Sequence, residues 1–181
     1  IYGGAFDPPH LGHKKIILSM IDQCDKLLLV PSFQSPHKNS LPISYESRLD
    51  MLMLMLTDIE TKVDILDFEH KNKVLYTYKT IDHIKSIYTN SKLTLIVGLD
   101  QYEKINEWKR SDYLISTVKL LVINRPGYHY DIKGSGIKFY DDLSVDISSS
   151  FIRNNFDQLY KVEDMLDPSV LSYIINNKLY I

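Results

Sequence analysis

The chain has 181 residues, of which 44% are apolar and 24% charged, and its formal net charge is −2. This composition is ordinary for a globular protein, and the small net charge argues against a nucleic-acid partner held by a basic surface. The single cysteine, Cys24, excludes an intrachain disulfide framework and a cysteine-based metal cluster. No apolar run approaches the length of a membrane span and no secretory signal is visible, so we expect no membrane partner and a reducing, cytoplasmic location.

Short apolar runs predict the strands, beginning at the first residue. Ile1 and Tyr2 read as the last residues of a strand whose earlier residues precede the sequence. Runs such as KLTLIVG and VKLLVIN are rich in Leu and β-branched residues and are bounded by turn signals, which suits strands buried on both faces of a parallel sheet. We therefore predict further strands over residues 26–32, 63–69, 92–98 and 118–124.

Helical patterns lie between these runs, over residues 11–23, 45–56, 76–88, 108–115 and 169–177, whereas residues 125–136 read as a loop. Alternating strands and helices predict an α/β fold with a Rossmann-like, doubly wound parallel sheet. The sequence holds no internal repeat and no low-complexity linker, so we expect one domain over residues 1–181. Ligands of such sheets bind beyond the carboxyl ends of the strands.

The stretch GGAFDPPHLGH, residues 3–13, follows the first strand. Gly3 and Gly4 predict a tight turn, after which a helix begins at Leu11. His10 and His13 then lie three residues apart on one face of the helix N-terminus, where free N–H groups and the helix dipole favour a phosphate. A metal site is the weaker interpretation, because no third ligand is obvious.

Two further clusters follow strands. PSFQSPHK, residues 31–38, brings His37 and Lys38 to a strand end, where they could offer charge to an anion. Taken alone, this stretch is better explained by a solvated lysine in a loop. ISSSFIR, residues 147–153, predicts a serine-capped helix that aims N–H groups, hydroxyls and Arg153 at one point. The guanidinium of Arg153 fits phosphate oxygens in a fork, and the alternative is a plain capped helix with a surface arginine.

Taken together, the three clusters resemble the nucleotidyltransferase superfamily that carries an H-x-G-H motif, and more narrowly the nicotinate-nucleotide adenylyltransferase family of NAD synthesis. The resemblance covers essentially the whole chain. It is carried by GGAFDPPHLGH, PSFQSPHK, YTYKT (residues 76–80), GLD with Trp108 (residues 98–108), NRPG (residues 124–127), ISSSFIR and the tail DPSVLSYIINNKLY (residues 167–180).

Two positions depart from the family pattern. Ala5 stands where Ser or Thr is usual, so one hydroxyl near the phosphates is absent. Ser150 stands where Thr is usual and keeps the hydroxyl. Neither change removes a charge, so we expect an effect of Ala5 on the rate and none on the type of reaction.

The resemblance implies that the phosphate of nicotinate mononucleotide attacks the α-phosphorus of ATP and releases pyrophosphate. A phosphate monoester has a second pKa of about 6 and is already mostly a dianion at neutral pH, so no general base is needed. In-line positioning and neutralisation of charge are what the reaction requires. Mg²⁺ is expected to arrive with ATP, and homo-oligomer formation is left open.

The resemblance also implies roles for particular residues. Catalysis is expected from His10, His13, Lys38 and Arg153. ATP is expected to bind to Gly3, Gly4, Ala5, Phe6, His10, His13, Gly98, Asp100, Ser148, Ser149, Ser150 and Arg153. The mononucleotide is expected to bind to Lys38, Tyr76, Thr77, Trp108, Lys109 and Arg125, with Trp108 stacked on the pyridine ring.

Other interpretations stay open at this point. A sibling enzyme that makes dephospho-coenzyme A or a CDP-alcohol would share H-x-G-H and the serine–arginine turn, but not Trp108 and Thr77. A nucleotide-binding module that has lost catalysis is another alternative, against which the intact His10, His13, Lys38 and Arg153 argue. Use of nicotinamide mononucleotide, alone or together with the nicotinate form, is a further alternative.

Overall fold

The computed structural model describes residues 1–34, 43–59, 62–124, 137–140 and 147–180. Six parallel strands form one sheet in the order β3-β2-β1-β4-β5-β6. The strand order reverses between β1 and β4, which makes their carboxyl ends the switch point of the sheet. The strands are β1 (Tyr2–Gly4), β2 (Leu27–Pro31), β3 (Val63–Ile65), β4 (Thr94–Gly98), β5 (Lys119–Ile123) and β6 (Ile137–Tyr140).

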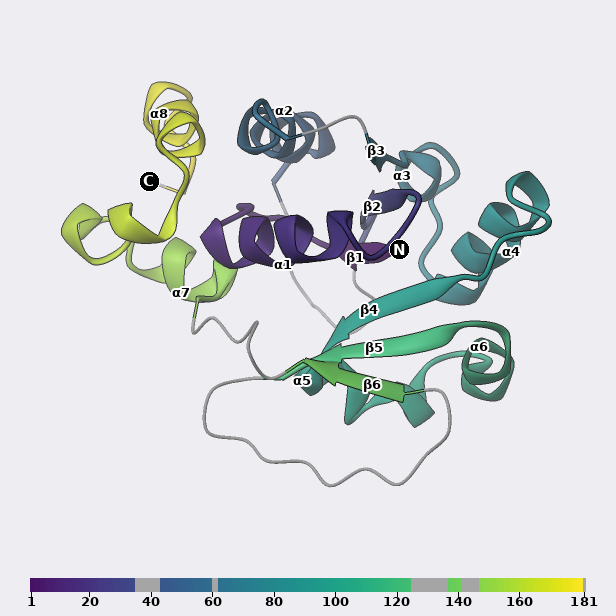
Figure 1. The fold of residues 1–181 in the computed structure, drawn as a ribbon. Coiled ribbons are helices and arrows are strands. Elements are labelled where there is room, and N and C mark those ends of the chain that lie inside the picture. The colour runs from purple at the N-terminus through teal and green to yellow at the C-terminus, as the bar shows by residue number, and fades with distance from the viewer. Residues whose placement is uncertain (35–42, 60–61, 125–136, 141–146, 181) are drawn as a thin grey trace.

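Helices cover both faces of the sheet, as predicted (Figure 1). The longer helices are α1 (Leu11–Ile21), α2 (Tyr45–Met55), α4 (Thr77–Ile87), α6 (Ser111–Thr117) and α8 (Pro168–Asn176). Short ones are α3 (Phe68–Lys71), α5 (Leu99–Tyr102), α7 (Ser149–Asn154) and the 3-10 turns Ile105–Glu107, Leu159–Lys161 and Glu163–Met165. In the described part of the chain, no helix has both the length and the apolar character that a bilayer crossing requires.

The apolar core is divided between the two faces because neighbouring strand residues point in opposite directions. Ile96 packs with α1, α2 and α8, whereas Leu95 and Val97 pack with α4 and α6. Every residue of β2 is buried, as expected for an inner strand of a parallel sheet.

The first strand runs further than predicted. Gly3 and Gly4 belong to β1 and pair with Val30 and Pro31, so they are not the turn. Gly4 is needed for another reason: a Cβ there would lie 3.2 Å from the ring of Phe6. The turn follows instead, where Phe6 has a positive φ of 50°.

Two other predicted elements differ from the structure, and one observed strand was not predicted. The strand predicted over residues 63–69 ends at Ile65, because Asp67 precedes the single helical turn α3. The helix predicted over 108–115 begins at Ser111, since Arg110 has a left-handed backbone with φ of 59°. Strand β6 was not predicted, because its four residues include a lysine and form no apolar run.

Candidate functional site

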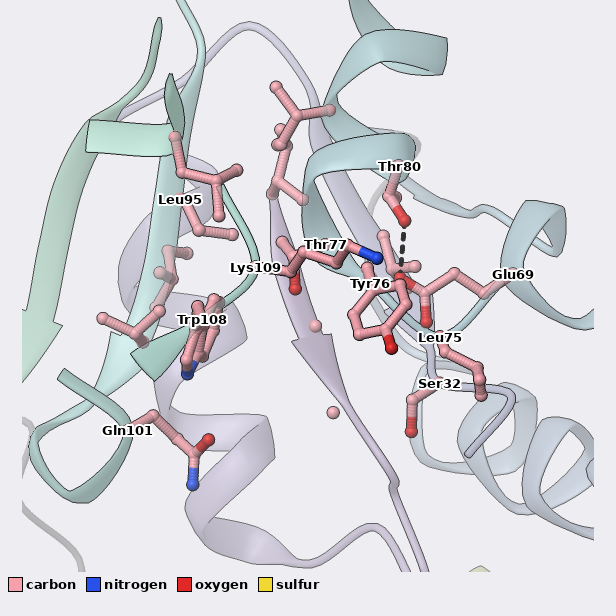
Figure 2. A pocket seen from close by; sticks show the side chains of 18 of the residues that line it. Ser32, Glu69, Leu75, Tyr76, Thr77, Thr80, Leu95, Gln101, Trp108 and Lys109 are labelled. Atoms are coloured by element: carbon pink, nitrogen blue, oxygen red, sulfur yellow. Dashed lines mark hydrogen bonds between the residues drawn. The ribbon is translucent and has the colours of Figure 1, made fainter. Parts of the chain in front are cut away.

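A cavity of about 700 Å³ opens at the switch point of the sheet (Figure 2). Its floor comes from the ends of two adjacent strands, Gly3 and Gly4 of β1 and Gly98 of β4, followed by Ala5. The predicted mononucleotide residues Tyr76, Thr77, Trp108 and Lys109 form its walls, so the fold brings these two predicted sets together.

The cavity walls offer aromatic surface and the ammonium group of Lys109. Trp108 and Tyr76 lie on opposite sides of the cavity in Figure 2. Trp108 is half-buried and packs against the core beneath α4 and α6, which fixes its ring. The ammonium of Lys109 lies 4.7 Å from the centroid of the Tyr76 ring, within cation–π range. A planar ring and an anionic substituent would both find partners here.

His10 and His13 meet at the start of α1, beside the loop that leaves β1. The backbone N–H of His10, the N-cap residue, donates to Nδ1 of His13 at 3.2 Å. Nδ1 of His13 is thus an acceptor, and the proton of the neutral ring belongs on Nε2. Nδ1 of His10 is buried and has no hydrogen-bond partner among the described residues.

Burial controls the charge of this pair. Burial lowers the pKa of His10 from 6.5 to about 4. Burial, and then the neighbouring His10, lower the pKa of His13 well below its usual value. Both rings are therefore neutral at pH 7 in the free protein and act first as hydrogen-bonding groups.

The serine turn of α7 holds the same loop from the other side. Ser149 donates to the carbonyl of Pro8 at 2.9 Å, and Arg153 donates to the carbonyl of Asp7 at 2.5 Å. Arg153 also donates to the hydroxyl of Ser150 at 3.3 Å, while Ser148 caps α7 by accepting from the N–H of Phe151. The predicted cluster is thus assembled around the loop that precedes His10.

Three residues that sequence reasoning missed support this loop. Tyr180 donates to the carboxylate of Asp7 at 2.7 Å, and Asp7 is buried. Arg48 is also buried and donates to the carbonyl of Ala5 at 2.7 Å. Asp7 and Tyr180 lie inside the matched motifs, and this was the one sequence signal that could have identified them. Arg48 lies outside those motifs, so no sequence signal pointed to it.

The remaining predicted residues fall into two groups. Asp100 lies exposed in the first turn of α5, whose N-cap is Gly98. A Cβ on Gly98 would lie 2.7 Å from Oδ1 of Asp100, so a larger residue there would make the carboxylate of Asp100 shift. Lys38 and Arg125 lie outside the described residues.

Comparison with known proteins gives consistent matches. Residues 1–155 match the family model described as cytidylyltransferase-like. A protein of Borrelia garinii subsp. bavariensis named a probable nicotinate-nucleotide adenylyltransferase is 35% identical over 186 residues, covering 100% of this chain and 93% of that protein. A protein of Leptospira interrogans with the same name is 32% identical over 190 residues, covering 99% and 95%.

A solved structure, the Plasmodium falciparum nicotinic acid mononucleotide adenylyltransferase complexed with NaAD, has the same fold. It superposes with a TM-score of 0.87 at 21% identity, covering 99% of this chain and 95% of that one. At this identity the likeness concerns the fold alone.

Proposed function

This chain belongs to the cytidylyltransferase-like family, and within it to the nicotinate-nucleotide adenylyltransferases, and we propose that it transfers AMP from ATP to nicotinate mononucleotide. The products are nicotinate adenine dinucleotide and pyrophosphate, a step of NAD biosynthesis. One observation carries the proposal: the cavity walled by Trp108 and Tyr76 and the loop that leads to His10 meet at the carboxyl end of β1.

The acceptor would occupy the cavity, with its pyridine ring against Trp108. Its phosphate, already a dianion at pH 7, attacks the α-phosphorus of ATP without a general base. ATP would lie over β1 and the start of α1, where helix N–H groups favour its phosphates. Catalysis then consists of in-line positioning and stabilisation of charge on the phosphates.

His10 and His13 would contact the ATP phosphates. His13 presents Nε2–H as a donor, because its Nδ1 is occupied by the N–H of His10. A polyanion placed against the pair raises both pKa values by opposite charge, so phosphate binding favours a proton on the rings. Arg153 would add its guanidinium fork to the β- and γ-phosphates.

Mg²⁺ would arrive with ATP, whose phosphate oxygens are the kind of ligand that this cation prefers. It would supply neutralisation of phosphate charge. Among the described residues there is no cluster of three or more His, Cys, Asp or Glu side chains arranged to hold a metal ion. Lys38 and Arg125 remain proposals for the mononucleotide phosphate, and we place the enzyme in the cytoplasm, which suits a single free cysteine.

The proposal is tested by pyrophosphate release from ATP with four acceptors: nicotinate mononucleotide, nicotinamide mononucleotide, phosphopantetheine and glycerol phosphate. We expect release with nicotinate mononucleotide and a dinucleotide product of matching mass. Release with phosphopantetheine or glycerol phosphate alone would assign a sibling reaction. Binding of ATP without release with any acceptor would indicate a nucleotide-binding module.

A further inference from the structure

The carboxyl group of Glu69 lies on the wall of the cavity and joins three segments of the chain (Figure 2). Glu69 belongs to α3. Its Oε1 accepts a hydrogen bond of 2.6 Å from the hydroxyl of Thr80 on α4, and the carboxyl also accepts from the backbone of Phe33, two residues after β2. Thr80 is buried, so this bond is shielded from water.

Thr80 lies one helical turn after Tyr76 and Thr77, the residues that begin α4 and line the cavity. Residues three and four positions apart share one face of a helix. A bond that holds Thr80 in place therefore also holds the first turn of α4. The side chain of the N-cap residue, Tyr76, makes no capping hydrogen bond in the described structure. The hydrogen bond from Thr80 to Glu69 therefore holds the first turn of α4 from the side, where the N-cap side chain makes no hydrogen bond.

The charge of Glu69 also matters, because the proposed acceptor carries a carboxylate. Burial raises the pKa of Glu69, whereas the hydrogen bonds from Thr80 and Phe33 lower it. An ionised carboxylate turned toward the acceptor would repel it. The bonds to Thr80 and Phe33 hold the carboxyl oxygens against the cavity wall. Glu69 therefore acts on the acceptor indirectly, by fixing the backbone of α4 through Thr80.

We propose that Glu69, through its hydrogen bond to Thr80, is a positioning residue that sets the place of Tyr76 and Thr77 for the mononucleotide, an inference that rests on the function proposed above. It predicts a selective effect. Losing the bond should weaken use of the mononucleotide and leave ATP, which lies over β1 and α1, largely unaffected.

The test compares Thr80→Val, which keeps the shape and removes the hydroxyl, with Thr80→Ser, which keeps the hydroxyl. Loss of a hydrogen bond to a carboxylate in Thr80→Val should raise KM for nicotinate mononucleotide about tenfold, with KM for ATP and kcat within about twofold of wild type. Thr80→Ser should restore most of the loss. Ser86→Ala, on the exposed face of the same helix, is the control.

Equal KM values for the mononucleotide in wild type and Thr80→Val would overturn the inference, as would a rise in both KM values together with a fall in kcat. If Thr80→Val does not fold, Glu69→Leu replaces it, because leucine fills similar space and removes the acceptor of the bond from Thr80; a selective rise in the same KM is then expected. Wild-type turnover is measured in the same experiment. Its absence with nicotinate mononucleotide would contradict the proposed function, whereas an active wild type with an unaffected Thr80→Val contradicts only the role of Glu69.

Discussion

The imidazole rings of His10 and His13 lie against each other, with centroids 3.7 Å apart and planes 31° from parallel. Burial lowers the pKa of both rings, and His10 lowers that of His13 further, so neither ring holds a proton at neutral pH in the free protein. The pair is therefore ready to accept a polyanion. In the proposed reaction, the phosphates would supply the negative charge that the buried rings lack, and the rings would donate hydrogen bonds where charge develops.

Replacing His13 by alanine tests whether the histidine pair contributes to the chemical step of the reaction. Removing one preorganised donor from the reacting phosphates should lower kcat by roughly 10²–10³-fold. The free energy of unfolding should change far less than turnover, because His13 is partly exposed, although its ring packs against Phe6 with centroids 5.0 Å apart. Steady-state turnover and urea unfolding measure the two effects. Lys15→Ala, an exposed change on the same helix, is the control, and near-normal turnover of His13→Ala would remove the assigned role.

The stability of the free protein should depend on pH through His10. Its pKa is about 4 in the folded state and near 6.5 in the unfolded state, so the unfolded chain binds more protons between these values. Stability is then fully present above pH 6.5 and is lost as pH falls, by about 3 kcal/mol at pH 4. His10→Asn, which keeps an N-cap residue, should show a shallower decline in urea unfolding from pH 7 to pH 4. Parallel curves for the two proteins would contradict this assignment.

Arg153 should not tolerate replacement by lysine. Its guanidinium reaches the carbonyl of Asp7 and the hydroxyl of Ser150 together, a geometry that an ammonium group cannot reproduce. We expect Arg153→Lys to raise KM for ATP about tenfold, roughly the cost of one lost charge-assisted hydrogen bond. Asn154→Ala, next to it on α7, serves as the control. An unchanged KM would leave Arg153 as a support for the loop alone.

The hydrogen bond from Tyr180 to buried Asp7 ties the last residues of the chain to the loop before His10. Tyr180→Phe removes only the hydroxyl and leaves a buried carboxylate with one partner fewer. The free energy of unfolding should fall by about 1–3 kcal/mol, as measured by urea unfolding. Tyr160→Phe, an exposed tyrosine, should change it by less than about 0.5 kcal/mol. Equal effects of the two changes would show that the bond to Asp7 contributes nothing.

Much of the fold could be predicted because its signals are local. The apolar runs around Leu95 and Leu121 gave two central strands, and the serine before Ser149 gave the start of α7. Gly3 and Gly4 were assigned to a turn, since a glycine that lets a bulky ring approach has the same appearance in sequence as one that turns the chain.

The supporting contacts could not be predicted because their partners are distant in sequence. Arg48 reaches Ala5 across 43 residues, and Tyr180 reaches Asp7 across 173. The short bond between Glu69 and Thr80 spans only 11 residues, but it crosses from α3 to α4 and has no periodic signature. Such contacts depend on tertiary packing, which side-chain spacing alone does not report.

Selection of the acceptor is the most direct test of the proposed function. Lys109, Thr77 and the backbone at the start of α4 offer donors to a carboxylate, whereas a neutral amide loses the charge-assisted part of each bond. Two such bonds, at about 1.5–3 kcal/mol each, should give nicotinate mononucleotide an advantage of at least about tenfold. Lys109→Met should reduce that advantage.

The decisive measurement is kcat/KM for the wild-type enzyme with nicotinate and with nicotinamide mononucleotide, at saturating ATP and Mg²⁺, followed by pyrophosphate release. We predict a value for the nicotinate form about tenfold to a hundredfold higher. Equal values, or a preference for the nicotinamide form, would contradict the proposed acceptor.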